Sequence, residues 1–219
     1  MGKINIAIDG PSASGKSTIA KRLCRELGYK HLDTGAMYRC VALKVKRTGT
    51  DYKDKKAMKE LLDNINIDFT PQGKVLLDGE DVSAEIRTNE ISMLASDVST
   101  ILEVRKFLVA LQQEMAKDKG YVMDGRDIGT VVLPDAEVQI FMTASAETRA
   151  QRRYLENKER GIKSNLRALK QEIIERDYQD THRTHSPLKK ADDAIEIDTS
   201  DMSIVQVTDE ILKIVETKL

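Results

Sequence analysis

Residues 10–17 read Gly10-Pro11-Ser12-Ala13-Ser14-Gly15-Lys16-Ser17. This octapeptide satisfies the pattern G-x-x-x-x-G-K-[ST] at every position. Glycines let a backbone wrap closely around a phosphate with its N–H groups pointing inward, and the positive end of the helix that follows favours the same anion. We therefore predict a phosphate-binding loop for a nucleoside triphosphate.

The residue types in this loop assign its chemistry. Lys16 is expected to reach the β- and γ-phosphates of ATP, and the Ser17 hydroxyl is the expected ligand of Mg²⁺. The predicted contacts to ATP are Gly10, Pro11, Ser12, Ala13, Ser14, Gly15, Lys16, Ser17 and Thr18.

The segments around the loop alternate between strand and helix patterns. An apolar run over 4–8 fits a buried parallel strand, and a helical pattern over 17–27 stops at Gly28. Similar reasoning predicts strands at 31–32, 121–123, 138–141 and 194–197, and helices after Gly35 and over 89–118, 146–181 (broken at Gly161) and 203–217. This alternation indicates an α/β fold, with a parallel sheet flanked by helices.

The segment from 64 to 83 differs from this pattern. Its apolar residues alternate, and turns at 71–73 and 78–79 separate short strand-like runs. We interpret it as a small antiparallel β unit inserted into the α/β domain.

Composition limits the classes of function. Hydrophobic residues make up 40% of the chain and charged residues 32%, which is typical of a globular protein. The net charge of −1 argues against a global electrostatic grip on nucleic acid. No apolar run reaches the length of about 18 residues that a membrane span needs. Neither a signal-peptide pattern nor a disulfide framework is evident, so we expect a cytoplasmic protein.

A phosphate-binding loop does not by itself name a reaction. GTPases read guanine with [NT]-K-x-D, and the nearest segment, Asn157-Lys158-Glu159-Arg160, lacks the aspartate. The acidic pair of larger ATP-driven motors is not evident either. A small kinase is the class that remains.

Two segments at predicted strand ends offer a second anion site. Asp33-Thr34-Gly35-Ala36-Met37-Tyr38-Arg39 combines a hydroxyl, a helix start and an arginine, although an ordinary helix cap with a surface arginine explains it equally well. Asp124-Gly125-Arg126-Asp127-Ile128-Gly129-Thr130 places Asp124 where it can hold the water shell of Mg²⁺, with a solvated turn as the alternative.

Two groups of charged residues on predicted helices complete the candidates. Arg149, Arg152 and Arg153 form a basic cluster, which is either a phosphate contact or a salt-bridged surface. Arg176, Asp180 and Arg183 share one helical face, which also fits a ladder of ion pairs.

These segments together resemble the bacterial cytidylate kinase family. The resemblance rests on 8–11, on 33–39, on Gly79-Glu80-Asp81-Val82 with Glu85-Ile86-Arg87-Thr88, on 124–132, and on Glu175-Arg176-Asp177 leading to Asp180 and Arg183. It extends from about residue 3 to the C-terminus and includes the β insertion. It implies ATP-dependent phosphorylation of CMP and dCMP in pyrimidine nucleotide metabolism, with Mg²⁺.

The resemblance also implies residue roles. Ser96, Arg105 and Asp127 match positions that contact cytosine, whose amine needs an acceptor and whose O2 and N3 need donors. Arg176 and Asp180 match positions near the ribose. The positions around the acceptor phosphate are Thr34, Arg39, Arg126 and Arg183. The arginines of a mobile lid are Arg149, Arg152 and Arg153, which together with Lys16, Arg126 and Arg183 are the expected catalytic residues.

The implied organisation is a single kinase domain, expected as a monomer that binds neither nucleic acid nor membrane. Its core is expected at 1–63, 89–145 and 181–219, its β insertion at about 64–88, and its lid with the lid-flanking helices at about 146–180. Kinases of AMP, UMP or shikimate, an ATP-binding regulator and a polynucleotide-end kinase remain as alternatives.

Overall fold

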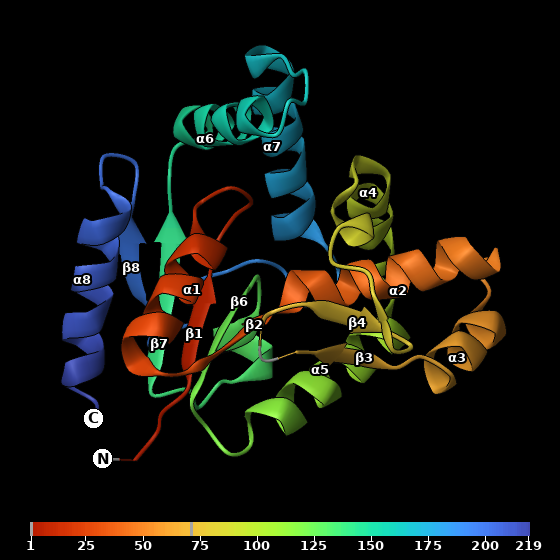
Figure 1. Ribbon diagram of the computed structural model, residues 1–219, viewed down its shortest axis with the longest axis horizontal. Coiled ribbons are helices and arrows are strands. Elements are labelled where there is room, and N and C mark those ends of the chain that lie inside the picture. Colours follow the sequence, from red (N-terminus) through yellow and green to blue (C-terminus); the bar gives the residue numbers. More distant parts are fainter. Residues whose placement is uncertain (1, 71) are drawn as a thin grey trace. The chain divides into compact units, whose positions relative to one another are not determined.

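The computed structural model describes residues 2–70 and 72–219 of the chain (Figure 1). They form two compact units. One contains the residues up to Leu32 and from Asp118 to Leu219, and the other contains Asp33 to Lys117. Within the described ranges, no helix combines the length and the apolar character needed to cross a membrane.

The first unit is built on a parallel sheet of five strands in the order β2-β6-β1-β7-β8. Its central strand β1 is buried at every residue, as expected for a parallel strand covered on both faces. Asp9, the last residue of β1, lies opposite Gly125 of β6 and Phe141 of β7. The strands are β1 (Ile6–Asp9), β2 (Lys30–Asp33), β6 (Tyr121–Gly125), β7 (Val138–Thr143) and β8 (Ile195–Asp198).

Helices α1 (Lys16–Leu27) and α8 (Ile204–Glu216) contribute to one apolar core with the strands β1, β6, β7 and β8. Their buried residues recur at helical spacing, as in Ile19 and Leu23 of α1. α8 begins with a capping box, in which Ser203 and Gln206 satisfy each other's backbone N–H groups.

Two further helices and one short turn complete the first unit. α6 (Ala146–Glu159) and α7 (Leu166–His182) pack against each other. A π-helical turn, η2 (Ile128–Val132), follows β6. Such turns are rare and often lie at functional sites.

The second unit combines helices with a three-stranded antiparallel sheet. Its sheet has the order β3-β4-β5, with β3 (Ile67–Phe69), β4 (Val75–Leu77) and β5 (Glu80–Asp81). Its helices are α2 (Thr34–Thr48), α3 (Lys55–Asp63), the 3₁₀ turn η1 (Glu85–Arg87), α4 (Asn89–Val98) and α5 (Leu102–Ala116).

Ion pairs tie the antiparallel sheet to α2. Arg47 of α2 donates to Glu80 at 2.7 Å and to Glu85 at 2.5 Å, and Lys44 pairs with Asp78. These side chains are partly exposed, so each pair adds little stability in water. They fix which face of the insertion lies on α2.

The predicted fold class is confirmed, and two local expectations need revision. The structure divides the helical stretch predicted over 89–118, because α4 ends at Val98 and the extended Ile101 precedes a second helix, α5. No helix was predicted over 55–63, where α3 lies. Its signal was Asp54, whose side chain accepts the N–H groups of Lys56 and Ala57 as a helix cap.

Two positions of α8 test the assigned core. Ile211 is 0% exposed and Ile204 is 50% exposed. Replacing Ile211 by Ala leaves a cavity and should lower the free energy of unfolding by about 2–5 kcal/mol. Ile204→Ala should change it by less than about 1 kcal/mol. Urea unfolding measures both, and equal losses would contradict the packing of α8 described above.

Candidate active site

The phosphate-binding loop begins directly after β1, and its first residue, Gly10, has no room for a side chain. A methyl group at Gly10 would lie 2.1 Å from the carbonyl oxygen of Met142, and Gly10 has a φ of 149°. Ala13 and Gly15 also have positive φ angles. This backbone leads directly into α1, whose first residue is Lys16. The local geometry is that of an anion-binding loop at a helix N-terminus.

Lys16 is folded back into this loop. Its Nζ donates to the carbonyl of Pro11 at 2.7 Å and to Ser14 Oγ at 3.3 Å. Burial, and then the positive charge of Arg126, lower the pKa of Lys16 to about 7. A polyanion entering the loop would supply the negative charge that favours the protonated form.

Ser17, Asp124 and His31 form a chain of hydrogen bonds. Ser17 Oγ donates to Asp124 Oδ2 at 2.5 Å, and His31 Nε2 lies 2.6 Å from Asp124 Oδ1. Burial opposes ionisation of Asp124, but the hydrogen bonds from His31 and Ser17 hold its pKa below the usual value. A hydroxyl beside an ionised carboxylate is the oxygen donor set that Mg²⁺ prefers, so these residues fit that ion.

The sequence analysis did not select His31. Its only signal was its place in the strand predicted at 31–32, and the order of the strands in the sheet was unknown. The structure puts β2 next to β6, so His31 reaches the carboxylate at the end of that strand.

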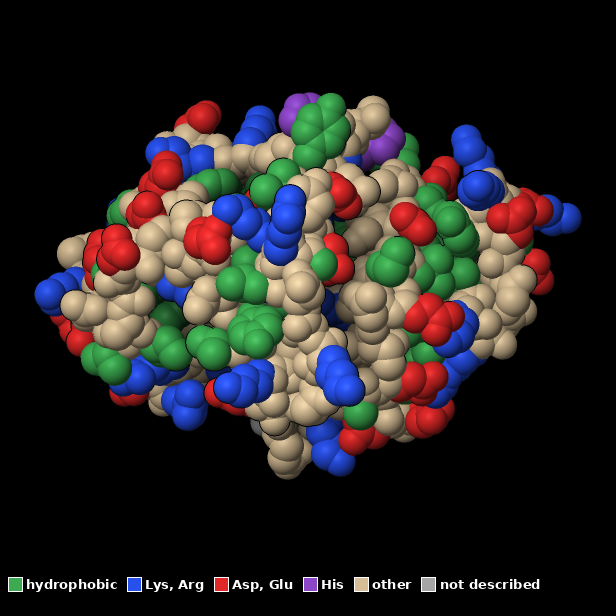
Figure 2. Space-filling model, turned by 90° about the horizontal axis from the view of Figure 1, so that it is seen from above, with side chains coloured by type: hydrophobic (Ala, Val, Ile, Leu, Met, Phe, Trp, Pro, Cys, Tyr) green, Lys and Arg blue, Asp and Glu red, His purple; other side chains and the backbone are tan. Residues whose placement is uncertain are grey.

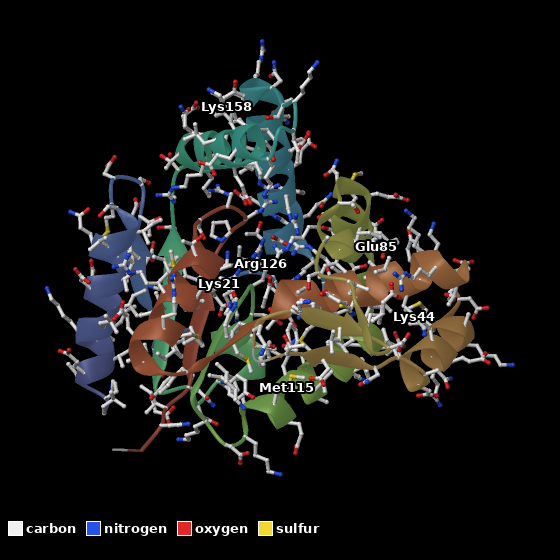
Figure 3. The ribbon with its side chains drawn as sticks, in the orientation of Figure 1. Lys21, Lys44, Glu85, Met115, Arg126 and Lys158 are labelled. Atoms are coloured by element: carbon white, nitrogen blue, oxygen red, sulfur yellow. The ribbon has the colours of Figure 1, made fainter. Side chains whose placement is uncertain are left out.

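Arg126, labelled in Figure 3, and Asp127 follow β6 and pair with residues at or just after the end of α7. Arg126 Nε donates to Asp180 Oδ2 at 2.7 Å, and Arg183 lies 3.7 Å from Asp127 Oδ1. Burial opposes the charge on Arg126, but Asp180 holds its pKa above the usual value. The structure therefore joins four of the predicted acceptor-site residues into one charge-balanced group.

The three arginines of α6 all contact the phosphate-binding loop. Arg149 donates to the carbonyl of Ser12 at 3.1 Å, Arg152 donates to the carbonyl of Ser14 at 3.2 Å, and Arg153 lies 3.3 Å from Ser12 Oγ. These contacts connect α6 to the loop.

Arg149 also forms a bidentate ion pair with Asp177 of α7. The two hydrogen bonds measure 2.9 and 2.5 Å, and a further one reaches the carbonyl of Ala144. With only 6% of its side chain exposed, Arg149 has most of its N–H groups engaged. Arg176, which precedes Asp177 on α7, is half-buried.

The remaining predicted residues lie in the second unit. Thr34 is buried at the start of α2, and Ser96 donates to the carbonyl of Ser92 within α4. Arg105 is 3% exposed, lies over the ring of Tyr38 at 5.7 Å, and donates to the carbonyl of Ser99. A guanidinium held in this way is fixed in orientation. Arg39 follows Tyr38 on α2.

Asp9 is a second residue that the sequence analysis did not select. It is 4% exposed, and its two carboxylate oxygens accept the N–H groups of Ile128 and Gly129 at 2.8 and 2.7 Å. Burial raises the pKa of Asp9 from 3.8 to about 6, although the two N–H groups lower it. The folded protein therefore binds this proton more tightly than the unfolded chain does. Stability from this group is present below pH 3.8 and is lost as the pH rises to about 6.

Comparisons with known proteins show which proteins this chain is similar to. A family model described as Cytidylate kinase matches residues 6–217. A cytidylate kinase of Caldicellulosiruptor saccharolyticus is 52% identical over 217 residues, covering 98% of this chain and 96% of that protein. One of Lactobacillus johnsonii is 49% identical over 218 residues, covering 98% and 95%.

Solved structures show the same fold at low sequence identity. An uncharacterized protein from Eubacterium ventriosum has a TM-score of 0.54 at 15% identity, covering 98% of this chain and 99% of that chain. TT1252 from Thermus thermophilus has a TM-score of 0.50 at 18% identity, covering 100% and 99%. These two similarities concern the fold alone.

The pair Arg149–Asp177 predicts how firmly α6 is held. Asp177→Asn keeps the shape but leaves a buried positive charge without its counter-charge, which costs about 3 kcal/mol. Hydrogen exchange of the α6 amides should then accelerate by roughly 10²-fold, because each 1.4 kcal/mol is about tenfold.

Glu156→Gln is the matched control, because it removes an ion pair with Arg160 in which both side chains are about half exposed. Such a pair is worth less than about 1 kcal/mol. If the two variants exchange equally fast, the buried pair does not anchor α6.

Proposed function

This chain belongs to the cytidylate kinase family, and from that premise we propose that it transfers the γ-phosphoryl group of ATP to CMP and dCMP. The products would be ADP with CDP or dCDP, a reaction of pyrimidine nucleotide metabolism. The observation that carries the proposal is the position of Arg126 and Asp127. They follow directly after β6, which pairs with β1, the strand that leads into the phosphate-binding loop.

On the donor side, the loop from Gly10 to Thr18 would bind the phosphates of ATP. Its positive-φ backbone and the buried Lys16 support this assignment. Ser17 would ligate Mg²⁺ directly and Asp124 through water, with His31 fixing the carboxylate. When bound, Mg²⁺ neutralises charge on the transferring phosphoryl group.

On the acceptor side, the residues of each unit have a separate task. In the first unit, Arg126 and Arg183 would bind the acceptor phosphate, Asp127 would accept the amine of cytosine, and Arg176 and Asp180 would lie near the ribose. In the second unit, Thr34 and Arg39 would bind the phosphate, while Ser96 and Arg105 would read the base. The fixed guanidinium of Arg105 over Tyr38 supports its role as a directed donor.

The chemistry needs no general base. The attacking group is a phosphate oxygen of the acceptor, which is already ionised at neutral pH. It forms a bond to the γ-phosphorus while the bond to the bridging oxygen of ADP breaks. Catalysis then consists of alignment and charge neutralisation, supplied by Lys16, Arg126, Arg183 and the α6 arginines, Arg149, Arg152 and Arg153.

We further propose a lid formed by about 146–180, which would close over the phosphates and exclude water. The core would comprise 1–63, 89–145 and 181–219, and the β insertion would comprise about 64–88. Figure 2 shows acidic and basic side chains intermixed over its visible face, which supports a protein that does not bind nucleic acid. We also propose that the protein is a monomer in the cytoplasm.

A panel of acceptors tests the reaction and its specificity. In a coupled assay of ADP release with ATP and Mg²⁺, we expect strong turnover with CMP and dCMP and little with AMP or GMP. Turnover of UMP equal to that of CMP would weaken the assignment of Ser96, Arg105 and Asp127. The proposed function is wrong if no monophosphate stimulates ADP release, a result that an ATP-binding regulator would give.

Arg126→Ala should lower kcat/KM for CMP by at least ~10²-fold, because it removes a charge partner of the phosphates. Arg25→Ala is the matched control, since Arg25 is exposed on α1 and its Nε donates to the carbonyl of Lys21. It should leave kcat/KM unchanged. A near-normal value for Arg126→Ala would remove this residue from the site.

A further inference from the structure

Asp9 connects two loops of the first unit: the phosphate-binding loop after β1 and the turn that follows β6. Through its backbone, it is the residue directly before Gly10, where the phosphate-binding loop begins. Through its side chain, it holds the turn that follows Arg126 and Asp127, by hydrogen bonds of 2.8 Å to Ile128 N and 2.7 Å to Gly129 N.

The turn η2 needs such a partner. The first N–H groups of any helical turn have no acceptor within the turn itself. The carbonyl of Asp127 accepts from Val131 and Val132. The N–H groups of Ile128 and Gly129 point instead to the carboxylate of Asp9. A residue of β1 thus caps a turn more than a hundred positions later in the chain, as the separation of 119 residues shows.

The turn also packs against β7. A methyl group at Gly129 would lie 2.6 Å from Gln139 Oε1, so the backbone of Gly129 packs closely on the side chain of a β7 residue. Gln139 is 8% exposed, and its amide donates to the carbonyl of Pro134 at 2.6 Å. The turn is therefore held by contacts to Asp9 of β1 and to Gln139 of β7.

A carboxylate is the one side chain of this size that can accept both N–H groups. Asn would accept one and turn its own NH₂ toward the other. The ionised carboxylate does not increase stability here, because burial raises the pKa of Asp9 to about 6. Lys16 of α1 lowers this pKa and Asp127 raises it, and Asp9 also contributes to the charge environment of Arg126.

We propose that Asp9 is a positioning residue for the acceptor nucleotide, holding the Ile128–Gly129 backbone so that the adjacent Asp127 and Arg126 face the base and phosphate of CMP. This inference rests on the proposed function. It assigns to Asp9 an effect on CMP recognition that is separate from binding of ATP, although Asp9 precedes the ATP loop.

The test compares Asp9→Asn with Glu137→Gln in the full-length protein. Glu137 makes the same kind of contact near the start of β1, where its carboxylate accepts the N–H of Asn5 at 2.9 Å. For Asp9→Asn we expect KM for CMP to rise roughly tenfold, since a buried N–H loses its acceptor. KM for ATP should stay within about twofold, and the preference for CMP over UMP should fall. Glu137→Gln should change none of these values.

The outcomes separate this inference from the function on which it rests. If the wild-type protein does not phosphorylate CMP, the proposed function fails. If it does, and Asp9→Asn raises both KM values equally or neither of them, the positioning role is wrong.

A second measurement needs neither a variant nor catalysis. In the wild-type protein without nucleotides, the amide resonances of Ile128 and Gly129 should shift with a common midpoint near pH 6, the value set by burial of Asp9. The Asn5 amide, bound to Glu137, should not share this midpoint. Resonances of Ile128 and Gly129 that share no midpoint anywhere between about pH 2 and 8 would show that Asp9 does not hold the turn, even if Asp9→Asn fails to fold.

Discussion

The parallel pairing of β1 with β6 is the constraint on which the rest of the site depends. It brings Asp9 and Gly125, the last residues of the two strands, opposite each other. The loop that follows each strand therefore starts at the same edge of the sheet. One loop is the phosphate-binding loop and the other carries Arg126 and Asp127. Two segments far apart in the chain become neighbours because parallel strands end at the same edge.

Charge in the first unit is balanced locally. Arg126 pairs with Asp180, Arg183 with Asp127, and Arg149 with Asp177. A buried guanidinium without a carboxylate or carbonyl partner would be unstable in a medium of low polarity. Phosphate groups would enter this network as new acceptors, in competition with the carboxylates already present. The arrangement keeps the site folded while its arginines remain close to the loop.

Much of the fold could be predicted from short patterns. The glycine loop, the helix that follows it and the antiparallel insertion are each encoded within about 20 residues, where hydrophobic periodicity and turn residues suffice. The division of 89–118 into two helices and the existence of α3 were missed, because Ile101 and Asp54 act through backbone geometry and capping that apolar periodicity does not report. His31 was missed for a different reason. A histidine in a strand acquires a partner only when the neighbouring strand is known.

The sequence by itself determined the phosphate-binding loop, the class of fold and the resemblance to cytidylate kinases, since each depends on residues that are close together in the chain. The tertiary structure alone decided which carboxylate meets which donor. Asp9 capping η2, His31 reaching Asp124 and Asp177 holding Arg149 each join separate elements. The orientations of these side chains depend on how strands and helices pack, and burial raises the pKa of Asp9, which no local pattern contains.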